Sequence, residues 1–279
     1  MRRMSKYMIR CDMEGASGVV AHEQAQPGNA EYASGRRMFM ADLLALLEGL
    51  QGGDADEFVV YDAHSHGRNI EIDRIPSFAS VVCGRPPYVT AWVGGIDHSF
   101  DGLILLGFHA KAGTENAILP HTYETDICEM RLNGVSVGEI GMEAALAGDF
   151  GVPLVMVSSD SAGVAEATHL VPGALAVIVK DAVGSTGGVC FPLTSTTDLI
   201  RAAATQLVKE PPRVKPYSVA EEVMLAIEFN EGSYLRGLKE LCGKKMKNDR
   251  TLLLQGTSAT DVWIQYLMVK QQIRPADSS

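Results

Sequence analysis

The feature that most constrains the fold of this chain is an alternation of short apolar runs with segments of helical spacing. Parallel strands need a crossover between them, so this order is typical of βαβ units. We therefore expect an α/β fold with a mostly parallel sheet flanked by helices. The expected strands are 7–11, 58–61, 102–106, 154–158, 174–179, 223–229 and 251–254, and the clearest helices are 32–50, 142–149, 197–208 and 259–270.

Two stretches interrupt the alternation. Residues 126–132 and 135–140 alternate in polarity around Asn133 and Gly134, the favoured pair for a type I′ turn, which predicts an antiparallel hairpin. Residues 209–216 contain three prolines, which deny the backbone both helix and central-strand pairing. We expect a linker there, between a metal-binding catalytic α/β domain (1–210) and a smaller C-terminal α/β subdomain (217–279).

The charge of the chain limits its partners. Its formal net charge is −10, whereas surfaces that bind phosphates concentrate Lys and Arg, so we expect no nucleic acid partner. No window approaches the roughly 20 apolar residues of a membrane span, and the basic start of the chain is not followed by the apolar stretch of a signal peptide. The five cysteines form no C-x-x-C pair. We expect a cytoplasmic protein that binds no membrane.

Two carboxylates, Asp12 and Glu14, follow the first predicted strand, and Gly15 permits a tight turn after them. In an extended chain, residues i and i+2 point to the same side. Ligands of open α/β sheets bind beyond the carboxyl ends of the strands. Both carboxylates can therefore face one ion, although a solvated acidic turn is the simpler explanation for such a pair taken alone.

Histidines follow the next two central strands in the same way. His64 comes after the strand 58–61, and His109 comes after the strand 102–106. A single histidine in such a place is more often a packed or capping residue than a ligand. Metal-capable side chains at three successive strand ends instead predict a shared site.

A further carboxylate, Glu139, ends the predicted hairpin and opens a helix, where it could equally serve only to stabilise the helix dipole. Oxygen ligands mixed with imidazole, and no thiolate, suit a catalytic zinc ion, with manganese or cobalt as substitutes. Five ligands exceed the needs of one tetrahedral ion. We therefore expect a bridged pair of ions about 3.5–4 Å apart.

His121 lies on an expected loop over this site, where it could act as base, acid or nucleophile, or be an incidental surface residue. Asp62 and Ser65 are candidates to orient one of the metal-binding side chains by contacting it without touching the metal. The other histidines stand in no comparable constellation: His22, His66, His98 and His169.

Together these motifs resemble the bacterial zinc-dependent D-aminopeptidases of dipeptide-transport operons and their peptidase relatives. The likeness runs through residues 12–15, 62–65, 106–111, 121, 137–141 and 226–229. It implies that His121 is the catalytic histidine, proposed in that family as the nucleophile. It also implies that two zinc ions are held by five ligands: Asp12, Glu14, His64, His109 and Glu139.

Members of that family release the amino-terminal residue of short peptides or amino-acid amides, and they assemble into large ring-like homo-oligomers. The resemblance therefore implies a metal-dependent aminopeptidase with such a substrate, and a ring-like homo-oligomer such as a decamer. Relatives differ in their preference for D- or L-residues, and no side chain decides between these from sequence.

Two other functions remain open from the residues alone. The same ion pair could serve an amidohydrolase or a phosphoesterase, although Lys111 is the main cation near the predicted site and phosphate recognition usually recruits Arg. The chain could also be a metal-stabilised peptide-binding module without turnover. Such a module would not need so many acid–base groups.

Overall fold

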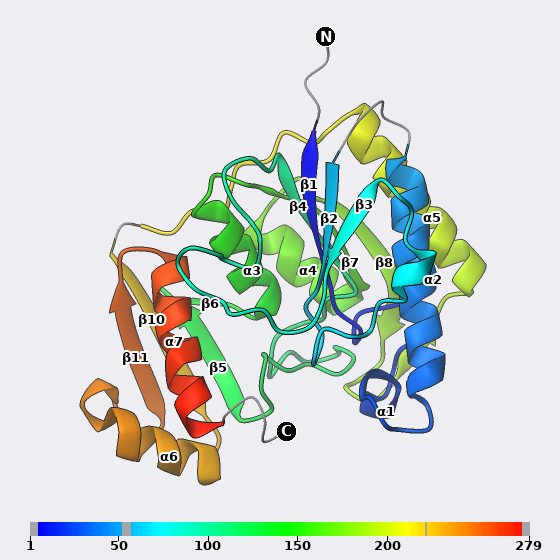
Figure 1. The fold of residues 1–279 in the computed structure, drawn as a ribbon. Helices are drawn as coiled ribbons and strands as arrows, with labels where there is room; N and C mark the ends of the chain where they lie inside the picture. Colours follow the sequence, from blue (N-terminus) through cyan, green and yellow to red (C-terminus); the bar gives the residue numbers. More distant parts are fainter. Residues whose placement is uncertain (1–4, 52–56, 221, 275–279) are drawn as a thin grey trace.

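The computed structural model of the chain describes residues 5–51, 57–220 and 222–274, and the start of the chain ahead of residue 5 lies outside them. Its main sheet has the strand order β3-β2-β1-β4-β7-β8-β9, parallel except for β9 (Figure 1). The strands are β1 Lys6–Cys11, β2 Glu57–Asp62, β3 Ala79–Val82, β4 Gly102–Leu106, β7 Leu154–Asp160, β8 Leu175–Ala182 and β9 Gly188–Cys190.

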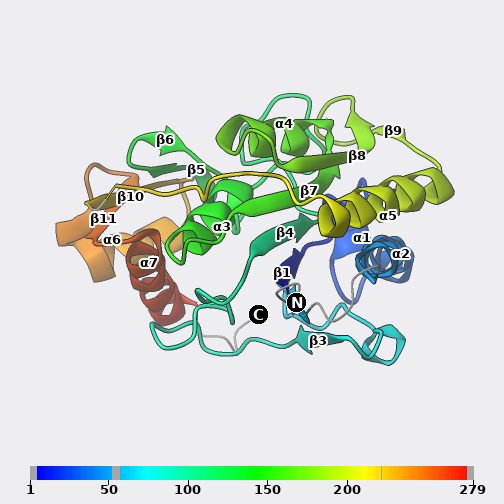
Figure 2. The ribbon, with the colours of Figure 1, turned by 90° about the horizontal axis from the view of Figure 1, so that it is seen from above.

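Helices cover both faces of this sheet. Helices α2 (Tyr32–Leu50) and α5 (Leu193–Lys209) pack on one face, and α3 (Glu139–Gly148) and α4 (Ser161–Leu170) lie on the other (Figure 2). A single turn, α1 (His22–Ala25), precedes α2, and 3₁₀ turns occupy Ile72–Arg74 and Gly243–Lys245. The fold is thus the mostly parallel α/β sheet that the alternation of runs predicts. No helix in the described part of the chain is long and apolar enough to cross a membrane.

A second, four-stranded antiparallel sheet has the order β11-β10-β5-β6. Its strands are β5 Ile127–Leu132, β6 Val135–Ser136, β10 Val223–Phe229 and β11 Thr251–Gly256, and helices α6 (Ser233–Cys242) and α7 (Ala259–Ile273) accompany it (Figure 1). The predicted hairpin is present, and Asn133 and Gly134 both have positive φ as a type I′ turn requires. Its second arm is shorter than expected, because α3 already begins at Glu139.

The expected strands and helices all form, with ends that differ by a few residues. Strands β3 and β9 and helix α4 were not predicted, since the two strands are only four and three residues long and α4 has few large apolar residues. The expected division after residue 210 stays a prediction. Strands β5 and β6, which precede the proline-rich segment, share a sheet with β10 and β11, which follow it.

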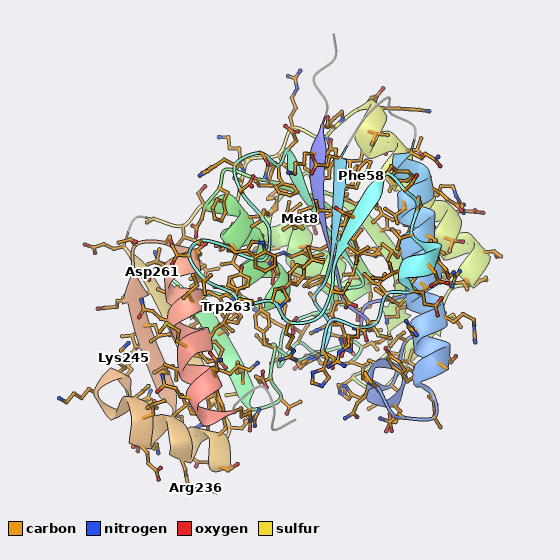
Figure 3. All side chains as sticks on the ribbon, viewed as in Figure 1. Met8, Phe58, Arg236, Lys245, Asp261 and Trp263 are labelled. Atoms are coloured by element: carbon orange, nitrogen blue, oxygen red, sulfur yellow. The ribbon has the colours of Figure 1, made fainter. Side chains whose placement is uncertain are left out.

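Three apolar cores hold these layers together, and Phe58, Met8 and Trp263 mark one core each (Figure 3). Helix α3 lies between two of them. Its Ile140 packs against the main sheet, while its Met142 packs against the second sheet. All ten residues of α3 are buried. The first residue of this helix is therefore fixed relative to both sheets.

The ends of β1, β2 and β4 are level with one another, because Cys11 pairs with both Asp62 and Leu106. The chain passes from β1 outward through β2 and β3, then returns to the other side of β1 as β4. Such a reversal of strand order opens a crevice at the carboxyl edge of a sheet. The structure thus provides a site where the sequence places Asp12, His64 and His109.

Beyond these ends, the turn after β1 touches the turn after β4. The Gly15 N–H donates to the Gly107 carbonyl at 2.7 Å, and a Cβ on Gly15 would lie 1.7 Å from the Phe108 carbonyl oxygen. Gly107 has a φ of 71°, and a Cβ there would lie 2.2 Å from the Asp12 carbonyl oxygen. Only glycine at both positions permits this approach.

We predict that Gly15→Ala destabilises the protein by about 1–3 kcal/mol or more, because the new Cβ would collide with the backbone of Gly107 and Phe108 just after β4. Gly187→Ala is the matched control, since a Cβ at Gly187 meets nothing within 4 Å, and it should change stability by less than about 0.5 kcal/mol. Urea unfolding of the metal-free variants measures both values. Equal stability of the two variants would show that the turns can separate freely.

Candidate metal centre

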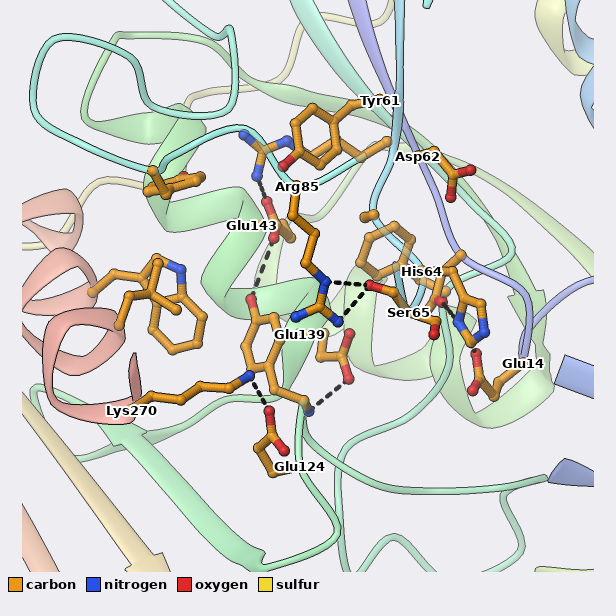
Figure 4. Close-up of a pocket in the computed structure, with 18 of the residues that line it drawn as sticks. Glu14, Tyr61, Asp62, His64, Ser65, Arg85, Glu124, Glu139, Glu143 and Lys270 are labelled. Carbon is orange, nitrogen blue, oxygen red and sulfur yellow. Dashed lines mark hydrogen bonds and ion pairs between the residues drawn. The ribbon is translucent and has the colours of Figure 1, made fainter. Parts of the chain in front are cut away.

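The predicted ligands meet at the crevice beyond β1, β2 and β4, where Figure 4 shows three of them, Glu14, His64 and Glu139. Asp12 and Glu14 continue β1, His64 follows β2, His109 follows β4, and Glu139 opens α3. Asp12, Glu14, His109 and Glu139 are buried, and the His64 side chain is 11% exposed. The structure therefore brings together all five side chains that the strand-end pattern and the resemblance single out.

Asp12 lies at the middle of the cluster. Its Oδ1 is 2.8 Å from His64 Nδ1, and its Oδ2 is 3.4 Å from His109 Nε2. On the first side, Glu14 Oε2 is 3.1 Å from the same His64 nitrogen. On the second side, Glu139 Oε1 is 3.2 Å from the same His109 nitrogen. The two oxygens of one carboxylate thus face two separate groups, each with one imidazole and one further carboxylate.

Backbone carbonyls fix the orientation of the imidazoles. His64 Nε2 is 2.7 Å from the Ala25 carbonyl oxygen, and His109 Nδ1 is 3.0 Å from the Ala110 carbonyl oxygen. A carbonyl only accepts hydrogen bonds, so each of these nitrogens carries the proton. In the neutral rings, the other nitrogen then presents a lone pair to the carboxylates. Metal-binding histidines typically donate the N–H that points away from the metal to a carbonyl or carboxylate in this way.

Without a cation or added protons, the centre contains too many acceptors. The buried atoms Glu14 Oε2 and His109 Nε2 have no hydrogen-bond partner, although each faces a neighbour of the cluster. Burial alone would lower the pKa of His64, but Glu14 raises that pKa well above its usual value. Burial likewise opposes protonation of His109, while Glu139 raises its pKa. The centre is therefore built to attract positive charge, and its nitrogen and oxygen atoms suit zinc.

Glu139 is held from several directions. Burial alone would raise its pKa, but His109 keeps the pKa below its usual value. The Tyr123 N–H donates to Oε1 at 2.7 Å, and the position of Glu139 at the amino end of α3 also favours its charge. The helix-dipole role and the role in the cluster, which are alternatives in the sequence, thus coincide in the structure.

Lys180 supports the turn that carries Glu14, and the sequence analysis missed it. This lysine is buried in β8, and its ammonium donates to the carbonyls of Glu14 at 2.6 Å, Ala16 at 2.9 Å and Val19. Burial lowers the pKa of Lys180 to about 8. The predicted strand 174–179 ends one residue before Lys180, whereas β8 continues to Ala182, so the buried position of this lysine was not evident from the sequence.

His121 lies over the centre, as predicted for its loop. Its ring stacks on that of His109 with centroids 4.0 Å apart, and its Nε2 is 3.8 Å from Glu139 Oε1. Its Nδ1 is 3.0 Å from the Leu119 carbonyl oxygen, so the proton of the neutral ring sits there and Nε2 is free. His22, which the sequence left aside, also lies close, with its ring centroid 5.9 Å from that of His121.

Asp62 does not contact the His64 imidazole directly but acts through Asn69. It accepts hydrogen bonds from the Asn69 N–H at 2.6 Å and the Asn69 side chain at 2.8 Å, and that side chain also donates to the His64 carbonyl. Asp62 therefore holds the loop that carries His64, while Ala25 orients the imidazole itself. Lys111 does not line the cavity over the centre, and its ammonium donates to Ser136.

We predict that zinc binding to the metal-free protein releases protons, because the neighbouring carboxylates raise the pKa values of His64 and His109 and zinc must displace the protons that these imidazoles hold. The affinity for zinc should therefore rise as the pH is raised through the pKa values of these imidazoles. Titration calorimetry at pH 7 in buffers of different ionisation enthalpy should detect at least about one released proton per protein. No proton release would contradict the assigned protonation.

Comparison with known proteins gives one curated relative and one solved structure. A D-aminopeptidase of Bacillus subtilis (strain 168) is 26% identical over 247 residues, which cover 88% of this chain and 89% of the relative. The solved structure, with a TM-score of 0.88 and 23% identity, covers 97% of this chain and 98% of that one. It is described as the Zn-dependent D-aminopeptidase DppA from Bacillus subtilis, a self-compartmentalizing protease.

The similarity to the solved structure shows that the two proteins share a fold. A family model described as D-aminopeptidase, Peptidase M55, matches residues 5–268. The match includes both sheets and all the residues of the metal centre. With nearly all of its 279 residues matched, the chain belongs to the D-aminopeptidase family of M55 peptidases.

Proposed function

We propose that this protein is a zinc-dependent aminopeptidase that removes the amino-terminal D-residue from short peptides or amino-acid amides. The observation that carries the proposal is the buried cluster in which one carboxylate, Asp12, faces two imidazoles with its two oxygens. Membership of the family supports the reaction. The zinc dependence of the similar solved structure supports the choice of metal.

The geometry favours two ions over one. Asp12, Glu14 and His64 would hold the first ion, and Asp12, His109 and Glu139 would hold the second. Each group offers three protein ligands, the usual number at a catalytic zinc, which leaves a position open for water or substrate. Asp12 would be the shared ligand of a pair about 3.5–4 Å apart. Manganese or cobalt could replace zinc in such a donor set.

When bound, the two ions would polarise the scissile carbonyl and lower the pKa of a water molecule. The protein itself supplies the proton transfers. The free Nε2 of His121 can accept a proton from the attacking group and return it to the leaving amine. As a nucleophile, the same nitrogen would instead bond to the scissile carbonyl carbon while the C–N bond to the leaving amine breaks, and water would then hydrolyse the acyl-imidazole. In both cases, the Leu119 carbonyl and the stacked His109 ring hold the imidazole in place.

The lining of the cavity argues against a phosphoesterase. Six carboxylates and three cations line it. Arg10 is paired with Glu143, and Lys270 is paired with Glu124. A phosphate ester would meet mostly negative charge there, whereas phosphate sites usually present several free Arg or Lys side chains. A binding module without turnover does not explain the free imidazole of His121 beside the cluster.

The solved structure that shares this fold is described as self-compartmentalizing. We accordingly propose that this chain also assembles into a ring-like homo-oligomer, such as a decamer, whose sites face an inner chamber. We also propose a cytoplasmic location. The five cysteines are free, and Cys83 and Cys190 are exposed, as suits a reducing compartment.

We predict that the metal-depleted protein releases no amino acid and that zinc restores release from D-aminoacyl amides and D-dipeptides, with L-substrates cleaved more slowly. A panel of matched D- and L-substrates, assayed beside metal analysis of the same samples, tests this. An inactive protein with both zinc ions bound would overturn the proposed function.

We predict that His121→Ala lowers kcat by about 10²–10⁴-fold, the usual range for loss of a general acid or base, and leaves zinc content unchanged. His169→Ala is the matched control, because His169 is exposed on α4 away from the centre, and it should retain full activity. Loss of zinc along with activity would instead make His121 a metal ligand, which its 3.8 Å approach to Glu139 would also permit.

A further inference from the structure

Arg85 is the unpaired cation of the cavity over the metal centre. This cavity has a volume of about 380 Å³ and is lined by Arg10, Arg85 and Lys270 as its cations. Arg10 and Lys270 each have a carboxylate partner. Within the described residues, no carboxylate lies within 4 Å of the Arg85 guanidinium nitrogens. Its charge is therefore available to a ligand.

The guanidinium of Arg85 is held beside the metal centre. Its Nε and Nη2 donate to the Ser65 carbonyl oxygen at 2.9 Å and 2.6 Å. Ser65 directly follows His64, so the anchor is one residue from a proposed metal ligand. Next to Arg85, the Gly84 N–H donates to the Gly67 carbonyl at 2.6 Å, which ties the two loops together. These hydrogen bonds give the exposed Arg85 side chain a preferred position beside the loop that carries His64.

This anchoring leaves donors free. A guanidinium has five N–H groups, and a single carbonyl oxygen receives two of those of Arg85. Figure 4 shows the Arg85 side chain reaching into the pocket to the level of Ser65. The remaining N–H groups can form the paired hydrogen bonds that arginine makes with a carboxylate.

Part of the cavity lining is apolar and aromatic. Trp263, Tyr266 and Leu267 of α7 form this part, and the Tyr123 ring lies against the Trp263 ring with centroids 4.4 Å apart. A substrate in this cavity would therefore meet both the Arg85 cation and an apolar surface. A residue with a free carboxylate and an aliphatic side chain has this combination of groups.

We propose that Arg85 binds the free α-carboxylate of the substrate, so that the protein prefers dipeptides with an unblocked carboxyl end to amides of the same sequence. The inference rests on the proposed function, which places the substrate's amine and scissile carbonyl at the metal centre. In a dipeptide the α-carboxylate belongs to the next residue, about 3.8 Å further along the chain. Arg85 is anchored to the residue that directly follows His64. Because six carboxylates line the cavity, a free substrate carboxylate needs such a cation.

The test compares D-alanyl-D-leucine with its carboxyl-terminal amide, which differs from it only in the charged group. The wild-type zinc-loaded protein should prefer the free acid by about tenfold or more in kcat/KM, the effect of a hydrogen-bonded charge pair. Arg85→Met should remove most of this preference by raising KM for the acid. The rate of Arg85→Met on the amide should stay within about threefold of wild type. Arg85→Lys should keep part of the preference, since lysine retains the charge but cannot donate the paired hydrogen bonds of a guanidinium.

Arg236→Met is the matched control, because Arg236 is exposed on α6 away from the cavity, and it should change neither substrate. Equal losses on both substrates in Arg85→Met, with lower zinc content, would show that the residue only supports the His64 loop and would overturn the proposal. Loss of the preference in Lys270→Met but not in Arg85→Met would also overturn it. A wild-type protein that cleaves acid and amide equally well would overturn the role of Arg85 alone, whereas one that cleaves neither would overturn the proposed function itself.

Discussion

The whole site depends on one electrostatic constraint: a buried group of hydrogen-bond acceptors needs positive charge. The carboxylates of Asp12, Glu14 and Glu139 face one ring nitrogen of His64 or His109. The other nitrogen of each ring already donates its N–H to a backbone carbonyl. A buried carboxylate without a partner is costly, so either protons or cations must enter. The tight glycine contact between the turns after β1 and β4 and the ammonium of Lys180 keep these acceptors together. The surrounding fold therefore maintains an arrangement that is favourable only when protons or metal cations supply positive charge.

Much of this could be predicted from the sequence, because the periodicity of parallel strands places chemistry at their carboxyl ends. Once the runs 7–11, 58–61 and 102–106 are taken as neighbouring parallel strands, Asp12, His64 and His109 must emerge at one edge. The structure confirms this, since Cys11 is paired with both Asp62 and Leu106. The turn at Asn133 and Gly134 and the helix that starts near Glu139 could be found from local signals alone.

The rest depends on tertiary pairing that local patterns do not encode. Alternation predicts that β5 and β10 are strands, but not that they pair with each other across the proline-rich segment. That pairing brings α7, with Trp263, to the cavity. Lys180 and Arg85 were missed for a related reason: each acts on a backbone carbonyl of a distant loop, and carbonyls carry no sequence signature. Residues that support a site through main-chain atoms are therefore the hardest to find without coordinates.

The most direct test of the account is anomalous diffraction at the zinc edge from crystals of the zinc-loaded protein. We predict two peaks about 3.5–4 Å apart, with Asp12 between them, one beside Glu14 and His64 and the other beside His109 and Glu139. A single peak, or peaks away from these side chains, would contradict the claim that this cluster of acceptors exists to hold a pair of metal ions.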